Sequence, residues 1–245
     1  MLKGKNAIIT GASRGIGREI AIKFSEQGAF VGLNYLSKDD AANQTLKIIR
    51  DKGGDGLLLG GDVSRQNDVE KIVKTFVKNK KTIDILVNNA GIYNRNKFID
   101  LSYEKWNEVI SINLTGCFNM CKSVIPHMKP GGKIIFLSSQ LALKGSTHGT
   151  DYASSKSGIL GLMRSLALEL AEKKINVNAV APGTIDTDII ADYTEEMRKK
   201  RIQEIPLKRL GTPEDVANTC LFLASDLSDY ITGETINING GLYIQ

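Results

Sequence analysis

The chain has 245 residues, of which 42% are hydrophobic and 24% charged, a composition typical of an ordinary globular protein. Its net charge of +5 is spread over many lysines, without the aromatic-interleaved basic stripe that indicates nucleic-acid binding. No stretch reaches the roughly 18 uncharged apolar residues of a membrane span, and the first residues show no secretory signal. We therefore expect a cytoplasmic protein that binds neither nucleic acid nor membranes.

The cysteines and histidines give no sign of a disulfide framework or a metal site. Three cysteines, an odd number, in a reducing compartment argue against disulfides. Cys117 and Cys121 lie one helical turn apart, but His127 and His148 are not placed to complete a ligand set. We predict that both thiols pack in apolar surroundings and that no metal binds.

The elements in chain order begin with a βαβ unit: a strand at 6–10, a glycine turn at 11–15, a helix at 16–28 and a strand at 29–35. Short apolar strands separated by helices are typical of a parallel sheet with helices on both faces. The alternation continues with helix 40–52, strand 57–62, helix 67–80, strand 84–89, helix 103–128, strand 133–139, helix 152–172, strand 175–182, helices 194–204 and 213–225, and strand 234–240.

No linker or shift in composition interrupts this alternation. We therefore predict one doubly wound α/β domain over residues 1–245, with a sheet of about seven strands. The periodicity is weakest between Thr184 and Gly211. Since loops that carry function must be able to open, residues 186–211 are predicted to form a substrate lid.

The stretch TGASRGIG, residues 10–17, stands where the first strand passes into the first helix. Gly11 permits a tight turn, Gly15 permits close approach of a pyrophosphate, and Gly17 lets the helix lie against the strand. The helix N-terminus supplies free N–H donors and the positive end of its dipole. A glycine turn alone is weak evidence, but in this strand–helix context it predicts nucleotide binding to a Rossmann-type domain.

Together with this turn, motifs along the whole chain resemble the short-chain dehydrogenase/reductase family. They are NNAG at 88–91, SINLTG with Asn113, FLSS with Ser139, YASSK, PGTIDT at 182–187 and ITGETINING. The chain looks most like the 3-oxoacyl-acyl-carrier-protein reductase branch, although the segment after NNAG, IYNRNKFIDLSYEKW, departs from the usual pattern of that branch.

The resemblance implies a nicotinamide cofactor and assigns residues to it. The expected contacts are Gly11, Ser13, Arg14, Gly15, Ile16, Gly17, Tyr35, Ser37, Asp62, Val63, Asn89, Ala90, Gly91, Tyr152, Lys156, Pro182, Ile185 and Thr187.

The end of the second strand favours NADP(H) over NAD(H). A site that prefers NAD usually has an acidic residue there, which accepts from the ribose hydroxyls and repels a 2′-phosphate. Tyr35 holds that position, and the next acids begin only at Asp39. Arg14, with Ser37 or Lys38, would bind the phosphate instead. The alternative is that Arg14 is simply a solvated surface charge.

Tyr152 and Lys156 share a face of the predicted helix because they are four residues apart. A free tyrosine, with a pKa near 10, is a poor acid at neutral pH. An ammonium at an assumed ~4 Å is worth about 4 kcal/mol at an effective dielectric constant of about 20, which would lower the phenol pKa by about three units. Taken alone, the pair is more often a solvated helix surface.

The resemblance assigns the catalytic roles. Tyr152 is the proton donor, Lys156 lowers its pKa and binds the nicotinamide ribose, and Ser139 positions the substrate carbonyl. Asn113 supports the proton relay by perturbing its helix and ordering a water. Ser138 is easily confused with Ser139, but the usual interval to the tyrosine selects Ser139.

The expected reaction is reduction of a carbonyl to a secondary alcohol, with a 3-oxoacyl thioester as one candidate substrate. Two alternatives stay open: a sugar or secondary-alcohol dehydrogenase, and a non-catalytic NADP(H)-binding sensor or scaffold. The predicted substrate pocket is largely apolar, with walls at Gln140, Leu141, Leu143, His148, Ile189, Ile190, Tyr193 and Met197.

Two kinds of protein partner follow from the resemblance. Lys129, Lys173 and Lys174 form a candidate basic face for an acidic acyl carrier protein, although surface lysines are more often only solvated. The last strand and the segment GGLYIQ resemble the terminus through which family members assemble as homotetramers. In that strand Ile236 and Ile238 alternate with polar residues, so one face is predicted to be buried.

Overall fold

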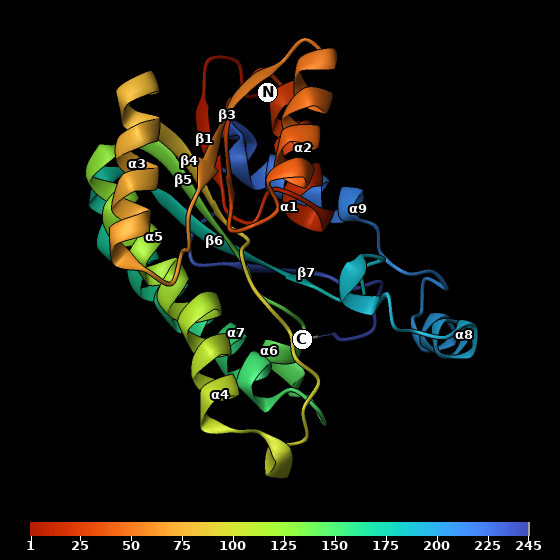
Figure 1. The fold of residues 1–245 in the computed structure, drawn as a ribbon. Coiled ribbons are helices and arrows are strands. Elements are labelled where there is room, and N and C mark those ends of the chain that lie inside the picture. Colours follow the sequence, from red (N-terminus) through yellow and green to blue (C-terminus); the bar gives the residue numbers. More distant parts are fainter. Residues whose placement is uncertain (245) are drawn as a thin grey trace.

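Seven strands pair in parallel in the order β3-β2-β1-β4-β5-β6-β7 (Figure 1). The computed structural model describes residues 1–244; Gln245, which belongs to the terminal segment singled out above, lies outside the described residues. The strands are β1 (Asn6–Ile9), β2 (Phe30–Tyr35), β3 (Asp55–Gly60), β4 (Ile83–Asn88), β5 (Met128–Leu137), β6 (Asn176–Pro182) and β7 (Thr235–Ile238).

Helices cover both faces of this sheet (Figure 1). Along β1, Ile8 and Ile9 are both fully buried, but they belong to two different core clusters, because successive side chains of a strand point to opposite faces. One face is covered by α1 (Gly15–Glu26), α2 (Asp39–Asp51) and α9 (Pro213–Ala224), the other by α3 (Gln66–Lys80), α4 (Tyr103–Ile110), α5 (Gly116–Val124) and α7 (Thr150–Leu170). The predicted doubly wound α/β fold is confirmed.

The strand order reverses between β1 and β4, which both pair with parallel neighbours. In doubly wound sheets, the crevice beyond the carboxyl ends of the strands at such a point is where ligands bind. The glycine turn follows β1 and the NNAG segment closes β4, so both predicted cofactor motifs lie at this crevice.

The single helix predicted over 103–128 is instead divided. A π-helical turn, Ser111–Thr115, separates α4 from α5, and the short 3₁₀ helix Ile125–His127 leads directly into β5 at Met128. Such π turns widen the helix and redirect its hydrogen bonds, frequently at functional sites. Asn113 lies at the centre of this turn and is fully buried.

Short elements complete the description. A short helix that the periodicity does not predict, α6 (Leu141–Lys144), follows β5, and the predicted lid contains the 3₁₀ turn Asp188–Ile190 and helix α8 (Glu195–Glu204). No residue of α8 is buried, and the helix stands away from the sheet (Figure 1). The remaining 3₁₀ turns are Phe98–Asp100, Ala171–Lys173 and Asp226–Ser228.

Within the described part of the chain, no helix is long and apolar enough to cross a membrane. Cys117 and Cys121 are buried, as predicted, and Cys220 is a buried thiol as well.

Candidate active site

The glycine turn adopts backbone conformations and contacts that a side chain would prevent. Gly11 and Gly15 have φ angles of +64° and +54°, in the left-handed region that favours glycine. A Cβ on Gly17 would lie 2.3 Å from the carbonyl oxygen of Gly11, so α1 can begin this close to the strand only with glycine there. The roles predicted for Gly11 and Gly17 match this local geometry.

The N-terminus of α1 offers donors to an anion. Arg14 precedes the helix in an extended conformation and its side chain makes no capping hydrogen bond, so the first-turn N–H groups are left to other acceptors. Uncapped N–H groups at the positive end of a helix dipole fit a pyrophosphate. The residues present therefore suit a dinucleotide cofactor.

The end of β4 is locked to the glycine turn by hydrogen bonds. Thr10 Oγ1 accepts from the backbone N–H groups of Asn89 and Ala90, both at 2.9 Å. The Asn89 side chain donates to the carbonyl oxygens of Thr10 and Gly11 at 2.8 and 3.2 Å. These bonds hold the two cofactor motifs in a fixed relative position.

The residues at the predicted 2′-phosphate position are mainly engaged with carboxylates. Arg14 forms a 2.9 Å ion pair with Asp188 of the lid, and both side chains are more than half exposed. The pKa of Tyr35 is raised by its hydrogen bond to Asp39 and by partial burial. Ser37 is exposed just beyond β2.

Tyr152, Lys156 and Ser139 line one cavity at the crevice. Tyr152 and Lys156 come from the first turns of α7, and Ser139 follows β5. Ser139 Oγ accepts from the backbone N–H of Leu141 at 3.1 Å. The hydroxyl of Ser138 instead donates to the backbone carbonyl oxygen of Lys156 at 3.0 Å.

The expected lowering of the Tyr152 pKa is not what this geometry gives. Burial raises the pKa of Tyr152 to about 12, only partly opposed by a hydrogen bond to Ser139. Lys156 Nζ donates to the carbonyl oxygen of Leu137 at 2.7 Å and lies 5.6 Å from the centroid of the Tyr152 ring. The sequence-based prediction assumed an ammonium ~4 Å from the phenol oxygen. It included neither the carbonyl acceptor that Lys156 uses nor the free-energy cost of burying a phenolate.

Lys156 is itself perturbed. Burial lowers its pKa to about 8, because a charged ammonium is poorly solvated there.

Asn113 joins three parts of the site. Its side chain accepts from the backbone N–H of Ile92 at 2.9 Å and donates to Ile92 O and Ser155 Oγ at 3.0 Å each. A Cβ on Gly91 would lie 3.1 Å from Asn113 Oδ1 and 3.4 Å from Lys156 Nζ, so Gly91 leaves room between these groups.

The cavity contains part of the predicted cofactor set. Besides the catalytic side chains it is lined by Ile16, Asn89, Gly91, Pro182, Ile185 and Thr187. The other predicted contacts lie outside it, on the glycine turn or beyond the ends of β2, β3 and β4: Gly11, Ser13, Arg14, Gly15, Gly17, Tyr35, Ser37, Asp62, Val63 and Ala90.

The substrate end differs from the apolar pocket predicted above. Leu143 does not line the cavity because it packs against the core, and Met197 does not because it is exposed on α8. The predicted walls that do line it are Gln140, Leu141, His148, Ile189, Ile190 and Tyr193. Sequence reasoning missed Tyr93, Arg95, Lys144 and Arg201, which add aromatic and cationic groups.

A signal for part of this set was present in the sequence. Tyr93 and Arg95 fall in the segment IYNRNKFIDLSYEKW, whose departure from the usual pattern after NNAG was noted but given no role. Tyr93 stacks on Tyr152 with ring centroids 4.5 Å apart.

Comparison with known proteins identifies the family of this chain. Residues 11–243 match a family model described as enoyl-(acyl carrier protein) reductase. The 3-oxoacyl-(acyl-carrier-protein) reductase FabG of Staphylococcus epidermidis is 40% identical, with 98% of this chain and 99% of the relative covered. Its counterpart from Chlamydia pneumoniae is 42% identical, with 98% of both covered.

Solved structures extend the likeness to three dimensions. A dehydrogenase/reductase from Sinorhizobium meliloti superposes with a TM-score of 0.95 at 32% identity, covering 99% of this chain and 96% of that one. A Brucella melitensis protein titled short-chain dehydrogenase/reductase, glucose/ribitol dehydrogenase, gives 0.93 at 34% identity, covering 100% and 98%. The chain therefore belongs to the short-chain dehydrogenase/reductase family, and it is an oxidoreductase.

Proposed function

We propose that this protein reduces a carbonyl to a secondary alcohol with NADPH and that its substrate is a 3-oxoacyl thioester. The observation that carries the proposal is the cavity in which the Tyr152 phenol, hydrogen-bonded to Ser139, lies beside buried Lys156. Relatives named as 3-oxoacyl-(acyl-carrier-protein) reductases, similar over nearly their whole length, support the choice of substrate.

In the proposed reaction the reduced nicotinamide, when bound, supplies a hydride to the carbonyl carbon. The hydroxyls of Ser139 and Tyr152 donate hydrogen bonds to the carbonyl oxygen and so stabilise the negative charge that develops there. A pKa of about 12 keeps the Tyr152 phenol protonated at neutral pH. Since an alkoxide is a much stronger base than a phenolate, the developing alkoxide takes the Tyr152 proton.

Lys156 and Asn113 support this transfer. Lys156 binds the nicotinamide ribose, and its ammonium stabilises the phenolate left after the proton has moved. Asn113 holds the segment after β4 against α7 through Ile92 and Ser155, and it contributes to the relay that returns a proton to Tyr152. Apart from the lowering of the Tyr152 pKa, these roles are those that the family resemblance implies.

The preference for NADP(H) is proposed from the residues beyond β2. Tyr35, and not an acidic residue, is the last residue of that strand, and the Asp39 carboxylate near it is hydrogen-bonded to the Tyr35 hydroxyl. Arg14 pairs with the exposed carboxylate of Asp188 in the lid. Since exposed ion pairs are worth only about 0–1 kcal/mol, Arg14 can exchange this carboxylate for a 2′-phosphate. Ser37 and Lys38 supply further donors.

An acyl carrier protein as the carrier of the substrate is part of the proposal. Lys129, Lys173 and Lys174 are exposed, and the backbone N–H of Gly131 donates to the carbonyl oxygen of Lys174 at 2.7 Å. This bond brings the beginning of β5 close to Lys174, which follows the 3₁₀ turn Ala171–Lys173, and we propose that the three lysines act as one basic face. The cytoplasmic location is also kept as a proposal, since three buried free thiols suit a reducing compartment.

A panel of substrates tests the proposed function. Oxidation of NADPH is followed with 3-oxoacyl thioesters, an enoyl thioester, simple ketones and aldoses, and the reverse reaction is followed with secondary alcohols and polyols. We expect the highest kcat/KM with 3-oxoacyl thioesters and NADPH. A higher kcat/KM for an enoyl thioester or a polyol, or equal values with NADH and NADPH, would contradict the proposal.

A further inference from the structure

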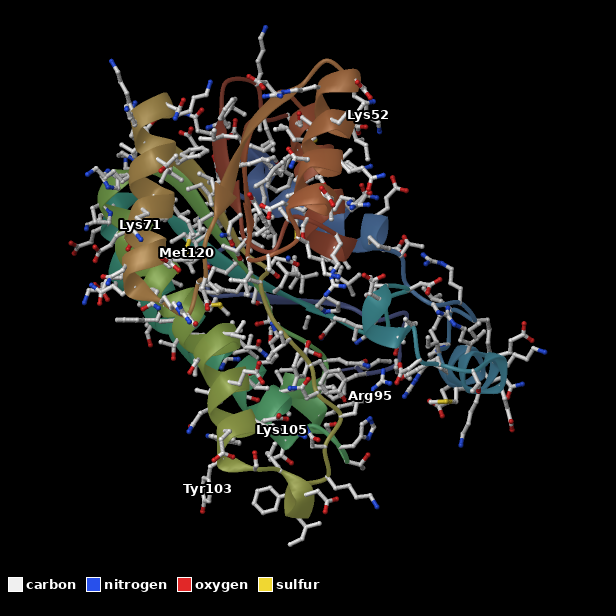
Figure 2. All side chains as sticks on the ribbon, viewed as in Figure 1. Lys52, Lys71, Arg95, Tyr103, Lys105 and Met120 are labelled. Carbon is white, nitrogen blue, oxygen red and sulfur yellow. The ribbon has the colours of Figure 1, made fainter. Side chains whose placement is uncertain are left out.

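We infer that the substrate carries an anionic group, a carboxylate or a phosphate, and that Arg95 recognises it; this rests on the proposed carbonyl reduction. Arg95 lies on the segment after β4, in the lower half of the view with α4, α6 and α8 (Figures 1 and 2). Its side chain lines the cavity that holds Tyr152 and is only 22% exposed.

The position of Arg95 is fixed by aromatic rings. Its guanidinium lies 4.6 Å from the ring centroid of Tyr193 in the lid and 5.7 Å from that of Tyr93. Tyr93 in turn stacks on Tyr152 at 4.5 Å. The guanidinium of Arg95 is therefore connected to the phenol ring through Tyr93. Ile16, the residue that follows the glycine turn in the sequence, lines the same cavity.

The charge distribution of the cavity favours an anion. Its lining includes the cationic side chains of Arg95, Lys144, Lys156 and Arg201. No aspartate or glutamate among residues 1–244 lines it. A cavity lined by cations and by no carboxylate attracts an anionic ligand and disfavours a cationic one.

Arg95 pairs with the carboxylate of Asp192, which occupies the place that a substrate anion would take. One guanidinium nitrogen donates to the carboxylate of Asp192, which is 67% exposed and lies outside the cavity lining, and the other donates to the carbonyl oxygen of Ile189 at 3.0 Å. The planar guanidinium fork suits a carboxylate or phosphate. A substrate anion entering the cavity would take the place of Asp192.

The anion has two chemical sources in a 3-oxoacyl thioester. It is either a carboxylate at the far end of the acyl chain or the phosphate of a phosphopantetheine arm on the thiol side. Three matched substrates separate them: the neutral 3-oxohexanoyl N-acetylcysteamine thioester, its 3-oxoadipyl analogue with a terminal carboxylate, and the 3-oxohexanoyl 4′-phosphopantetheine thioester.

The test compares kcat/KM for each anionic substrate with that for the neutral one in the wild type, Arg95→Met and Asp192→Asn. Loss of a charge-assisted bidentate contact should lower one of these ratios by about ten- to a hundredfold in Arg95→Met. In Asp192→Asn the same ratio should rise, because the competing carboxylate is gone. The ratio that responds identifies the source of the anion.

Arg198→Met is the matched control. Like Asp192, Arg198 belongs to the lid. It forms a 2.8 Å ion pair with Asp186 and donates to the carbonyl oxygen of Ile190, but it does not line the cavity. Its replacement should leave both ratios at the wild-type value. If Arg95→Met and Asp192→Asn lower kcat/KM of all three substrates by one common factor, the pair is only a latch between the segment after β4 and the lid, and the inference is wrong.

A binding measurement keeps the inference separate from the proposed function. Calorimetric titration with pentanoate and with pentanamide, each in the presence of NADP⁺, should show tighter binding of the carboxylate by the wild type and no such difference in Arg95→Met. Equal binding of the two ligands by the wild type would overturn the inference. Failure to turn over any of the three thioesters would overturn the proposed function alone.

Discussion

The buried ammonium of Lys156 sets the electrostatics of the site at the scale of single residues. It lies behind Tyr152, donates to the carbonyl oxygen of Leu137, and has a pKa of about 8 because of burial. The phenol has a pKa of about 12 for the same reason. Burial therefore disfavours the charged form of both groups: it destabilises the Lys156 ammonium and keeps the Tyr152 phenol protonated for the proposed proton transfer.

Replacement of Lys156 by methionine tests this burial through stability. Between pH 8 and 10.5 the folded protein binds fewer protons at this site than the unfolded chain, so the free energy of unfolding of the wild type rises with pH in that window. Below pH 8 the full cost of the charged form is present. The stability of Lys156→Met relative to wild type should thus fall by up to about 1.4 kcal/mol per pH unit across the window.

Denaturant unfolding of both proteins at pH 7 and pH 10 measures this difference. The carbonyl oxygen of Leu137 loses its partner in the variant at either pH, so that effect cancels in the comparison. A stability difference that stays constant between the two pH values would show that Lys156 is not desolvated in the folded protein.

The spacing of the motifs identifies four candidate catalytic residues in the sequence: Ser139, Tyr152, Lys156 and Asn113. It does not predict the pKa values of Tyr152 and Lys156. The i, i+4 spacing places Lys156 and Tyr152 on one face of α7, but the acceptor that Lys156 uses comes from β5, an element distant in the sequence. Burial and long-range acceptors depend on tertiary packing, which helical spacing does not describe.

At the scale of elements, the contact between β1 and α1 depends on Gly17. A Cβ there would meet the carbonyl oxygen of Gly11 at 2.3 Å and the side chain of Asn89 at 2.4 Å. Gly17→Ala should therefore push α1 away from the turn, destabilise the protein by about 1–3 kcal/mol and weaken NADPH binding. Thermal unfolding and a fluorescence titration with NADPH measure the two effects.

Gly161→Ala is the control for this substitution. Gly161 lies within α7, and a Cβ there would have no neighbour within 4 Å. Because alanine is the better helix former, this variant should be more stable by up to about 1 kcal/mol and should bind NADPH as the wild type does. If both variants behave alike, the close approach of α1 to the turn does not determine cofactor binding.

The strands and most helices could be predicted from periodicity, but the segment over 103–128 could not be divided correctly. Every fourth residue from Val109 through Asn113 and Cys117 to Cys121 is buried, so helical periodicity continues across the π turn and does not reveal it. The end of the helix was also missed at β5, because Met128 and the following polar residues do not read as a strand. That part of β5 is formed by pairing rather than by an apolar pattern, with Met128 opposite Ile83 in β4.

At the scale of the whole molecule, exposed apolar side chains and an open strand edge are candidate contacts for the predicted assembly. Tyr103, Phe118 and Leu168, on α4, α5 and α7, are 86%, 48% and 82% exposed, although large apolar side chains are normally buried. At the other end of the sheet, β7 is an edge strand that pairs only with β6. Exposed apolar side chains and open edges are what subunit contacts cover.

We expect a homotetramer. Sedimentation equilibrium at micromolar concentration should give four times the subunit mass of 26.7 kDa. Phe118→Lys and Leu168→Lys should shift the distribution toward smaller species if α5 and α7 form the contact, whereas Lys38→Glu, at the far side of the sheet, should not. A monomer mass for the wild type would show that these side chains are exposed in solution.

The double-wound architecture and the place of the site at the crevice followed from the order of strands and glycines along the chain. The charge of the substrate end did not, because Arg95, Lys144 and Arg201 come from three separate segments. Only the folded chain brings them to one cavity, and each alone reads as a solvated surface charge. The prediction of a largely apolar pocket was therefore incomplete, because it left out the cationic side chains that bear on specificity.

The central claim, that Tyr152 delivers the proton for NADPH-dependent reduction, is tested most directly by Tyr152→Phe. The variant keeps the aromatic ring that stacks on Tyr93 and removes only the hydroxyl. Reduction of a 3-oxoacyl thioester should be lost, while the Kd for NADPH, measured by fluorescence titration on the same preparation, should stay near the wild-type value. A variant that retained near-full turnover would contradict it.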